Sequence, residues 1–160
     1  MNKLREYIPY ILIILSIIAI RMYVITPVRV DGPSMNPTLK QGQILLLNKL
    51  DKNYERMDIV VFYHHGERLI KRVIGLPYET VSIKDNKLYI NGILTDDYAD
   101  VETKDYDLNV TIPKDYYFVL GDNRSNSLDS RALGLISKDK IVGSVRLRLL
   151  PPGIVWLYLF

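Results

Sequence analysis

The chain has 160 residues, 48% of them hydrophobic and 24% charged, a composition that fits one modest folded domain plus an appendage. The formal net charge of +3 is small and basic and acidic residues alternate, so we expect no nucleic-acid partner. The absence of cysteine excludes a thiol nucleophile, a disulfide framework and thiolate metal sites.

The first predicted element is an apolar segment near the N-terminus. Residues 8–20 read IPYILIILSIIAI, and counting through Ile25 gives the length of about 20 residues that a membrane-spanning helix needs. A cleaved secretory signal would end in a small-x-small site, which AIRMYVITP lacks, and a buried core helix would show polar spacing. We therefore expect a single-pass membrane anchor over residues 1–26. Because Lys3 and Arg5 precede this first helix, we place its N-terminus inside the cell and the rest of the chain at the outer face of the cytoplasmic membrane.

Residues 27–160 predict an all-β domain. Short runs rich in Val, Ile, Leu and Tyr are separated by turn signals such as HHGE, KDN and NG. This pattern is typical of mixed, barrel-like β-sheets. We expect strands within residues 28–32, 43–50, 57–64, 68–75, 79–85, 87–92, 116–123 and 140–150.

Two segments of this domain look different from the strands. Residues 95–115 are acidic and polar, so we expect a surface excursion between strands. The tail, residues 151–160, reads PPGIVWLYLF and is too short to cross a bilayer as a helix. A final strand on the core and a hydrophobic edge resting on the membrane both fit the tail.

The only histidines, His64 and His65, are adjacent in FYHHGERL. Neighbouring residues of a strand point to opposite faces, so a metal site or a catalytic triad built from this pair is less plausible than a polar hairpin turn. We therefore expect no metal site at these histidines.

The stretch VDGPSMNPTL holds Ser34 in a turn-rich run, and a serine hydroxyl is a poor nucleophile until a base takes its proton. In RLIKRVIGLP, strand alternation puts Lys71 on one face between Leu69 and Val73. Burial of that face would lower the pKa of the lysine, and a drop of about 2.5 units leaves roughly a tenth of it neutral at pH 7. The alternative is a lysine whose head reaches solvent, beside a core-facing Arg72.

A third polar stretch, VLGDNRSNSLDSRALG, covers residues 119–134 and follows an aromatic strand. It is either a solvated loop with Asx turns or an internally satisfied network in which Asp129 pairs with Arg131 or Arg124.

Four motifs together resemble a known family. GPSMNPTL, MDIVVF, LIKRVIGLP and GDNRSNSLDSRALG follow the apolar segment in this order and look like the successive boxes of type I signal peptidases. The resemblance spans about residues 7–143 and is closest to the short, single-anchor forms of Gram-positive bacteria. It implies a membrane-bound serine endopeptidase with a Ser–Lys dyad, which needs no metal or cofactor. Such an enzyme removes N-terminal signal peptides from exported preproteins after small-x-small motifs, so its expected partners are signal peptides and the lipid bilayer.

The resemblance also implies roles for single residues. Ser34 matches the family nucleophile and Lys71 its general base, while Ser127 matches a serine that hydrogen-bonds and orients the lysine. The residues that match the supporting loop are Asp122, Asp129 and Arg131, and those that match the oxyanion and substrate-binding positions are Gly32, Ser34 and Met35. Gly32 stands where Gram-negative members place a hydroxyl donor, and LPYET replaces the usual LPGD after the lysine.

Two other functions fit parts of the sequence. A non-catalytic, membrane-tethered relative that binds exported substrates would be expected to lose Ser34 or Lys71, and both are present. A self-cleaving Ser–Lys protease of the repressor type is disfavoured by the N-terminal segment and by the lack of a recognisable DNA-binding element.

Overall fold

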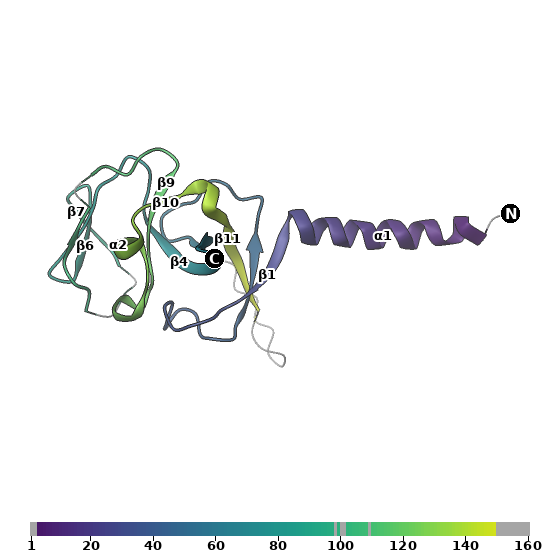
Figure 1. Cartoon of the computed structure of the whole chain (residues 1–160), viewed down its shortest axis with the longest axis horizontal. Helices are drawn as coiled ribbons and strands as arrows, with labels where there is room; N and C mark the ends of the chain where they lie inside the picture. Colours follow the sequence, from purple (N-terminus) through teal and green to yellow (C-terminus); the bar gives the residue numbers. More distant parts are fainter. Residues whose placement is uncertain (1–2, 98, 100–101, 109, 150–160) are drawn as a thin grey trace.

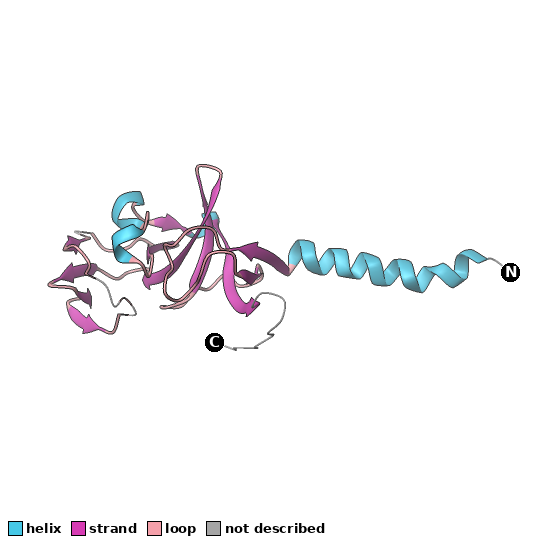
Figure 2. Cartoon of the chain, turned by 90° about the horizontal axis from the view of Figure 1, so that it is seen from below, coloured by secondary structure: helices cyan, strands magenta, loops and turns pink. Residues whose placement is uncertain are grey.

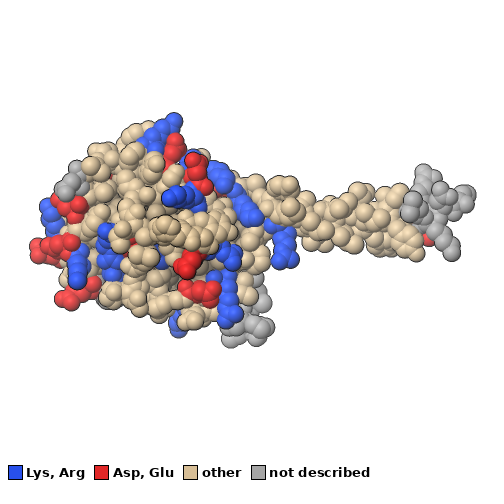
Figure 3. All heavy atoms as spheres, in the orientation of Figure 1, with Lys and Arg blue, Asp and Glu red and all other residues tan. Residues whose placement is uncertain are grey.

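The computed structural model describes residues 3–97, 99, 102–108 and 110–149, and shows one long helix projecting from a β-rich body (Figure 1). The helix, α1, spans Lys3–Tyr23. Its segment Glu6–Tyr23 is long and apolar enough to cross a membrane, and none of that segment is buried. Acidic and basic side chains are scattered together over the visible face of the body, whereas the middle of α1, residues 7–20, has no charged side chain (Figure 3).

The helix passes almost directly into the first strand, β1, Ile25–Arg29. Ile25 and Thr26, which we expected to close the anchor, are therefore strand. Thr26 is β-branched and precedes a proline, and both properties disfavour helix. Lys49 Nζ donates to the carbonyl oxygen of Met22 at 2.9 Å, and this bond satisfies one of the free carbonyls at the helix C-terminus.

Seven antiparallel strands form the larger sheet, in the order β1-β2-β11-β3-β4-β9-β10. Pro27 lies in β1, an edge strand, where its missing N–H breaks no interior ladder. The other strands of this sheet are β2 (Ile44–Asn48), β3 (Ile59–His64), β4 (Glu67–Gly75), β9 (Tyr116–Leu120), β10 (Ile136–Ser137) and β11 (Ile141–Leu149).

Four antiparallel strands form a smaller sheet at the end of the body farthest from α1, in the order β7-β6-β5-β8 (Figures 1 and 2). These strands are β5 (Val81–Lys84), β6 (Lys87–Ile90), β7 (Ile93–Thr95) and β8 (Tyr106–Asp107). The remaining elements are short helices: η1 (Arg124–Asn126), α2 (Ser130–Leu133) and η2 (Lys138–Lys140).

The all-β prediction with a single N-terminal apolar helix is confirmed. Its barrel-like description needs a correction, because the strand orders run from edge to edge and neither sheet closes on itself within the described residues. The hairpin expected at the histidines is also confirmed. His64 ends β3, and His65 and Gly66 both have positive φ, as a two-residue turn with the twist of the flanking strands requires.

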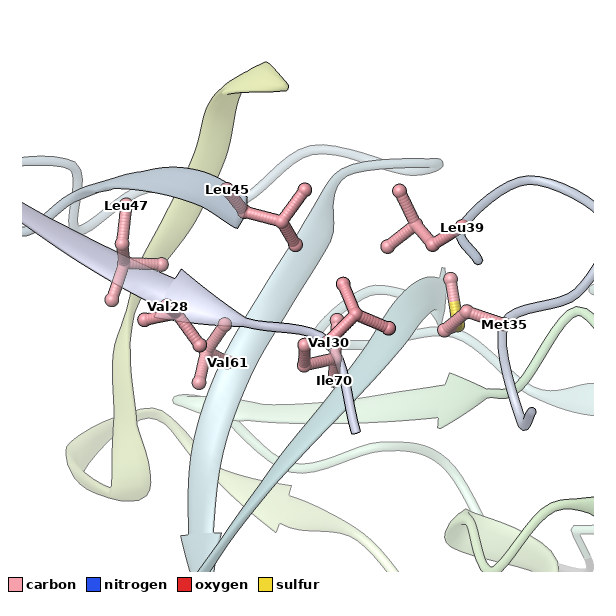
Figure 4. Close-up of a cluster of buried hydrophobic side chains, with 8 residues drawn as sticks. All are labelled: Val28, Val30, Met35, Leu39, Leu45, Leu47, Val61 and Ile70. Carbon is pink, nitrogen blue, oxygen red and sulfur yellow. The ribbon is translucent and has the colours of Figure 1, made fainter. Parts of the chain in front are cut away.

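Strand β4 lies between β3 and β9 and touches all three hydrophobic clusters of the core. Ile70 joins the cluster drawn in Figure 4, Val73 a second cluster, and Ile74 a third that lies between the two sheets. Every residue from Ile70 to Gly75 is buried, so β4 is covered on both faces. Any polar side chain on this stretch is thereby removed from water.

The surface excursion expected over residues 95–115 is wrong in part. Ile112 is fully buried in the third cluster and Thr103 is also buried, so this segment helps to close the smaller sheet. Ile112 ends LNVTI, an apolar–polar alternation that the sequence analysis did not use, although Val110 of the same alternation is exposed. The prediction for the tail, residues 151–160, lies outside the described residues.

Candidate active site

Ser34 and Lys71, which are 37 positions apart in sequence, meet in the structure. Lys71 Nζ donates to Ser34 Oγ at 2.8 Å and to the carbonyl oxygen of Ile70 at 2.9 Å. Lys71 is only 2% exposed, whereas Ser34 is half-buried and remains open to a ligand. Alternation along β4 places Lys71 among buried neighbours, as the sequence indicated. The alternative in which the lysine head reaches solvent is therefore wrong.

Burial lowers the pKa of the Lys71 ammonium from 10.5 to about 8, although the negative charges of Asp129 and Asp122 act to raise it. Removal of an ammonium from water disfavours its charged form, and here this effect outweighs the two carboxylates. Roughly a tenth of the lysine is then neutral at pH 7. A neutral amine within hydrogen-bond distance of an alcohol can accept the alcohol's proton.

The next residue on β4, Arg72, is also buried but keeps its charge through a carboxylate. Arg72 Nε donates to Asp122 Oδ1 at 2.9 Å, and Nη2 donates to Oδ2 at 2.6 Å. Arg72 Nη1 also donates to the carbonyl oxygen of Met57 at 3.0 Å. The sequence analysis placed Asp122 in the supporting loop but did not find this partner. An arginine on the buried face of a strand is the signal that could have found it, since such a charge requires an acid.

A second ion pair lies near the C-terminal end of the polar loop, where Arg131 Nε and Nη2 each donate to Asp129 at 2.8 Å. Asp129 also accepts the backbone N–H of Gly121 at 3.1 Å. Burial alone would raise the pKa of the Asp129 carboxyl, but these hydrogen bonds and the Arg131 charge hold it below its ordinary value. Of the two pairings left open for Asp129, the structure has the one with Arg131.

Gly121 connects this loop to the serine. The carbonyl oxygen of Ser34 accepts the N–H of Asn123 at 3.0 Å, so the loop backbone holds the backbone of the serine directly. A Cβ placed on Gly121 would lie 2.6 Å from Ser34 O and 2.1 Å from Ser127 Oγ. Only glycine fits between these two serines, and the sequence analysis did not single it out.

Ser127 lies beside this contact, but the structure differs from what the resemblance implied. Ser127 Oγ is buried and makes no hydrogen bond, so its expected bond to Lys71 is absent. The hydroxyl lies near enough to Asp129 to help hold that carboxylate ionised.

The two other predicted site residues flank Ser34. Gly32 has φ +91, in the region that favours glycine, and an added Cβ there would touch nothing within 4 Å. Met35 is 1% exposed and packs in the cluster of Figure 4 with Val30, Leu39 and Ile70. The loop around Ser34 is thus anchored by the residue that follows the serine. The described residues contain no group of three His, Cys, Asp or Glu side chains able to hold a metal ion.

Comparison with known proteins gives consistent matches. Residues 4–150 match the family model described as signal peptidase, peptidase S26. Signal peptidase I P of Bacillus subtilis subsp. natto is 40% identical over an alignment that covers 94% of this chain and 91% of the relative. Signal peptidase I T of Bacillus subtilis (strain 168) is 40% identical, with 88% and 82% covered. The crystal structure of a signal peptidase I from Enterococcus faecalis V583 is 38% identical and superposes with a TM-score of 0.53, covering 57% of this chain and 96% of that one.

Proposed function

Since the chain belongs to the signal peptidase family, peptidase S26, and is a serine peptidase, we propose that Ser34 and Lys71 form a catalytic dyad that removes signal peptides from exported preproteins. The observation that carries this proposal is the 2.8 Å contact between Ser34 Oγ and the buried Lys71 amine. Burial of a lysine that has no ion-pair partner costs folding free energy, which favours a functional role for Lys71.

The geometry supports a two-step acyl transfer. Neutral Lys71 takes the proton of Ser34 as Oγ attacks the scissile carbonyl, and the Ser34 N–H stabilises the resulting oxyanion. The Lys71 ammonium then protonates the leaving amine, which departs as the mature protein. Water attacks the acyl-enzyme with Lys71 as base, so the carboxylate product leaves and Ser34 Oγ regains its proton.

The supporting residues hold this dyad in place. Asp122 neutralises Arg72, and Asp129 with Arg131 braces the loop that contacts Ser34. Ser127 belongs to the same loop and is the group that would orient the Lys71 amine during the reaction. Gly32 and Met35 flank the nucleophile, where an extended substrate with small side chains would lie.

Helix α1 would anchor the enzyme in the cytoplasmic membrane. Its segment Glu6–Tyr23 has 18 residues and a length of about 27 Å, close to the hydrocarbon core of a bilayer. Its exposed apolar side chains require a nonpolar environment, which lipid supplies. With the N-terminus inside, residues 27–160 form the catalytic domain on the outer face, where cleavage after small-x-small motifs would release exported chains.

Cleavage of a model preprotein by the purified full chain in detergent micelles tests this function, with the product identified by its mass. Replacement Ser34→Ala should abolish cleavage, and Lys71→Met should do so while keeping the side-chain volume. Lys84→Met, on an exposed position of β5, is the matched control and should leave the rate unchanged. The rate should rise about tenfold per pH unit up to about pH 8 and then level off. Cleavage by the Ser34→Ala variant, or no cleavage by the wild type, would exclude the proposal.

A further inference from the structure

The buried ion pair between Asp97 and Arg124 has no part in the chemistry above. The Arg124 side chain is 1% exposed and that of Asp97 is 14% exposed. Arg124 Nη1 donates to Asp97 Oδ2 at 2.7 Å, and Nη2 donates to Oδ1. This is a bidentate pair of the strong, geometrically specific kind. Asp97 follows β7 of the smaller sheet, whereas Arg124 belongs to the polar loop beside Ser34.

The third nitrogen of the same guanidinium, Nε, binds the backbone next to Ser34. Arg124 Nε donates to the carbonyl oxygen of Gly121 at 3.0 Å. The N–H of Gly121 is held by Asp129, so both polar groups of this residue are fixed by buried side chains. Because the guanidinium is planar and rigid, a partner that fixes Nη1 and Nη2 also fixes the direction in which Nε–H points. Asp97 holds those two nitrogens.

The position of Gly121 in turn constrains Ser34. A Cβ there would lie 2.6 Å from the Ser34 carbonyl oxygen, so the two backbones are in close contact. A shift of Gly121 therefore moves the serine or opens a gap behind it that water can enter.

We propose that Asp97 is a positioning residue, which orients Arg124 and through Gly121 holds Ser34 against Lys71. The proposal rests on the dyad proposed above. On this proposal, the segment that follows β7 of the smaller sheet supplies the Asp97 carboxylate to Arg124 of the polar loop. Ala99 N donates to Asp97 Oδ1 at 3.3 Å, so the carboxylate itself is fixed from its own side.

The test compares Asp97→Asn with Asp96→Asn in the full chain in detergent micelles. Both changes remove one negative charge at neighbouring positions, but Asp96 is exposed. For Asp97→Asn we expect kcat to fall about ten- to a hundredfold with KM within about twofold, the size of effect that a displacement near 1 Å produces. We also expect the midpoint of the pH–rate profile to move above about 8, because water then reaches the amine. Rates are expressed per folded molecule, measured by pulse proteolysis.

A double variant, Asp97→Asn with Arg124→Met, covers the case in which the single variant fails to fold. It leaves no unpaired buried charge, yet Gly121 O still lacks its donor, so kcat should stay low in a folded protein. Restored kcat in the double variant would overturn the proposal, as would an unchanged kcat in Asp97→Asn or an equal loss in Asp96→Asn. If wild-type protein and Asp96→Asn both fail to cleave, the proposed function itself is wrong. If they cleave and Asp97→Asn does so equally well, only the positioning role is wrong.

Discussion

Replacement of Lys71 by methionine should make the protein inactive. It should also raise the unfolding free energy relative to wild type, and this gain should be larger at low pH than at high pH. The folded-state pKa of about 8 lies below the ordinary value of 10.5, so between these values the unfolded chain binds the proton more tightly. Wild-type stability therefore has a penalty that is fully present below about pH 8 and disappears as the pH rises toward 10.5. Methionine has nearly the same length and no proton to bind, so the variant has no such penalty.

The magnitude follows from the shift. A difference of about 2.5 pKa units corresponds to about 3 kcal/mol of unfolding free energy below pH 8. Integration of the linkage relation gives a change of about 2 kcal/mol in the gap between wild type and variant from pH 6.5 to 9.5. The lost hydrogen bonds to Ser34 and to the Ile70 carbonyl offset part of the gain, by about 1 kcal/mol each. That offset does not depend strongly on pH, so the slope of the gap is the informative quantity.

Urea unfolding of the full chain in detergent micelles, followed by pulse proteolysis at several pH values, measures this gap. Titrations common to both proteins cancel in the difference. The control is Lys84→Met on β5, because an exposed ammonium meets water in the folded and the unfolded chain alike. A gap for Lys71→Met that stays constant from pH 6.5 to 9.5 would refute the argument that burial lowers the pKa of this amine.

Three further substitutions test other parts of the structure. Gly121→Ala should reduce kcat about a hundredfold with the fold retained, because the new methyl group would lie 2.6 Å from the Ser34 carbonyl oxygen and displace the backbone; normal kcat would contradict that contact. Ser127→Ala should lower the unfolding free energy by about 1 kcal/mol, because the hydroxyl helps to hold the buried Asp129 carboxylate ionised; an unchanged urea midpoint would contradict that interaction. Tyr78→Gly should raise the unfolding free energy by about 1 kcal/mol in urea unfolding. Tyr78 has φ +71, a backbone conformation that favours glycine, and its side chain is 67% exposed, so little packing is lost; an unchanged urea midpoint would argue against strain there.

Much of the fold could be predicted because its strands carry their own periodicity. The eight runs chosen from the sequence overlap β1–β6, β9 and β11, although β1 shares only Val28 and Arg29 with its run and β4 begins one residue before its run. The strands β7, β8 and β10 have two or three residues each, too few for an alternation to be visible. The end of the anchor was placed at residue 26, three residues beyond the end of the helix at Tyr23, because hydropathy does not distinguish an apolar helix from the apolar residues that follow it.

The site was predictable in its chemistry but less so in its pairings. Alternation along one strand placed Lys71 between aliphatic residues, and the structure has it buried there beside Ser34. The partners of the arginines lie 27 and 50 positions away, in Asp97 and Asp122, and no local pattern connects residues across sheets. Such pairings are set by strand order, which the sequence does not state.

The distribution of carboxylates explains why Lys71 has a lowered pKa while the arginines near it remain charged. Arg72, Arg124 and Arg131 each occupy a carboxylate bidentately, through Asp122, Asp97 and Asp129 respectively. Guanidinium groups stay charged in proteins, so each of these carboxylates remains paired with its arginine. In the part of the chain that the structure describes, Lys71 makes no ion pair and has only an alcohol and a carbonyl oxygen as acceptors. The carboxylates at Asp122 and Asp129 still raise its pKa at a distance, but with their oxygens held by arginine they cannot bind the ammonium, and burial prevails.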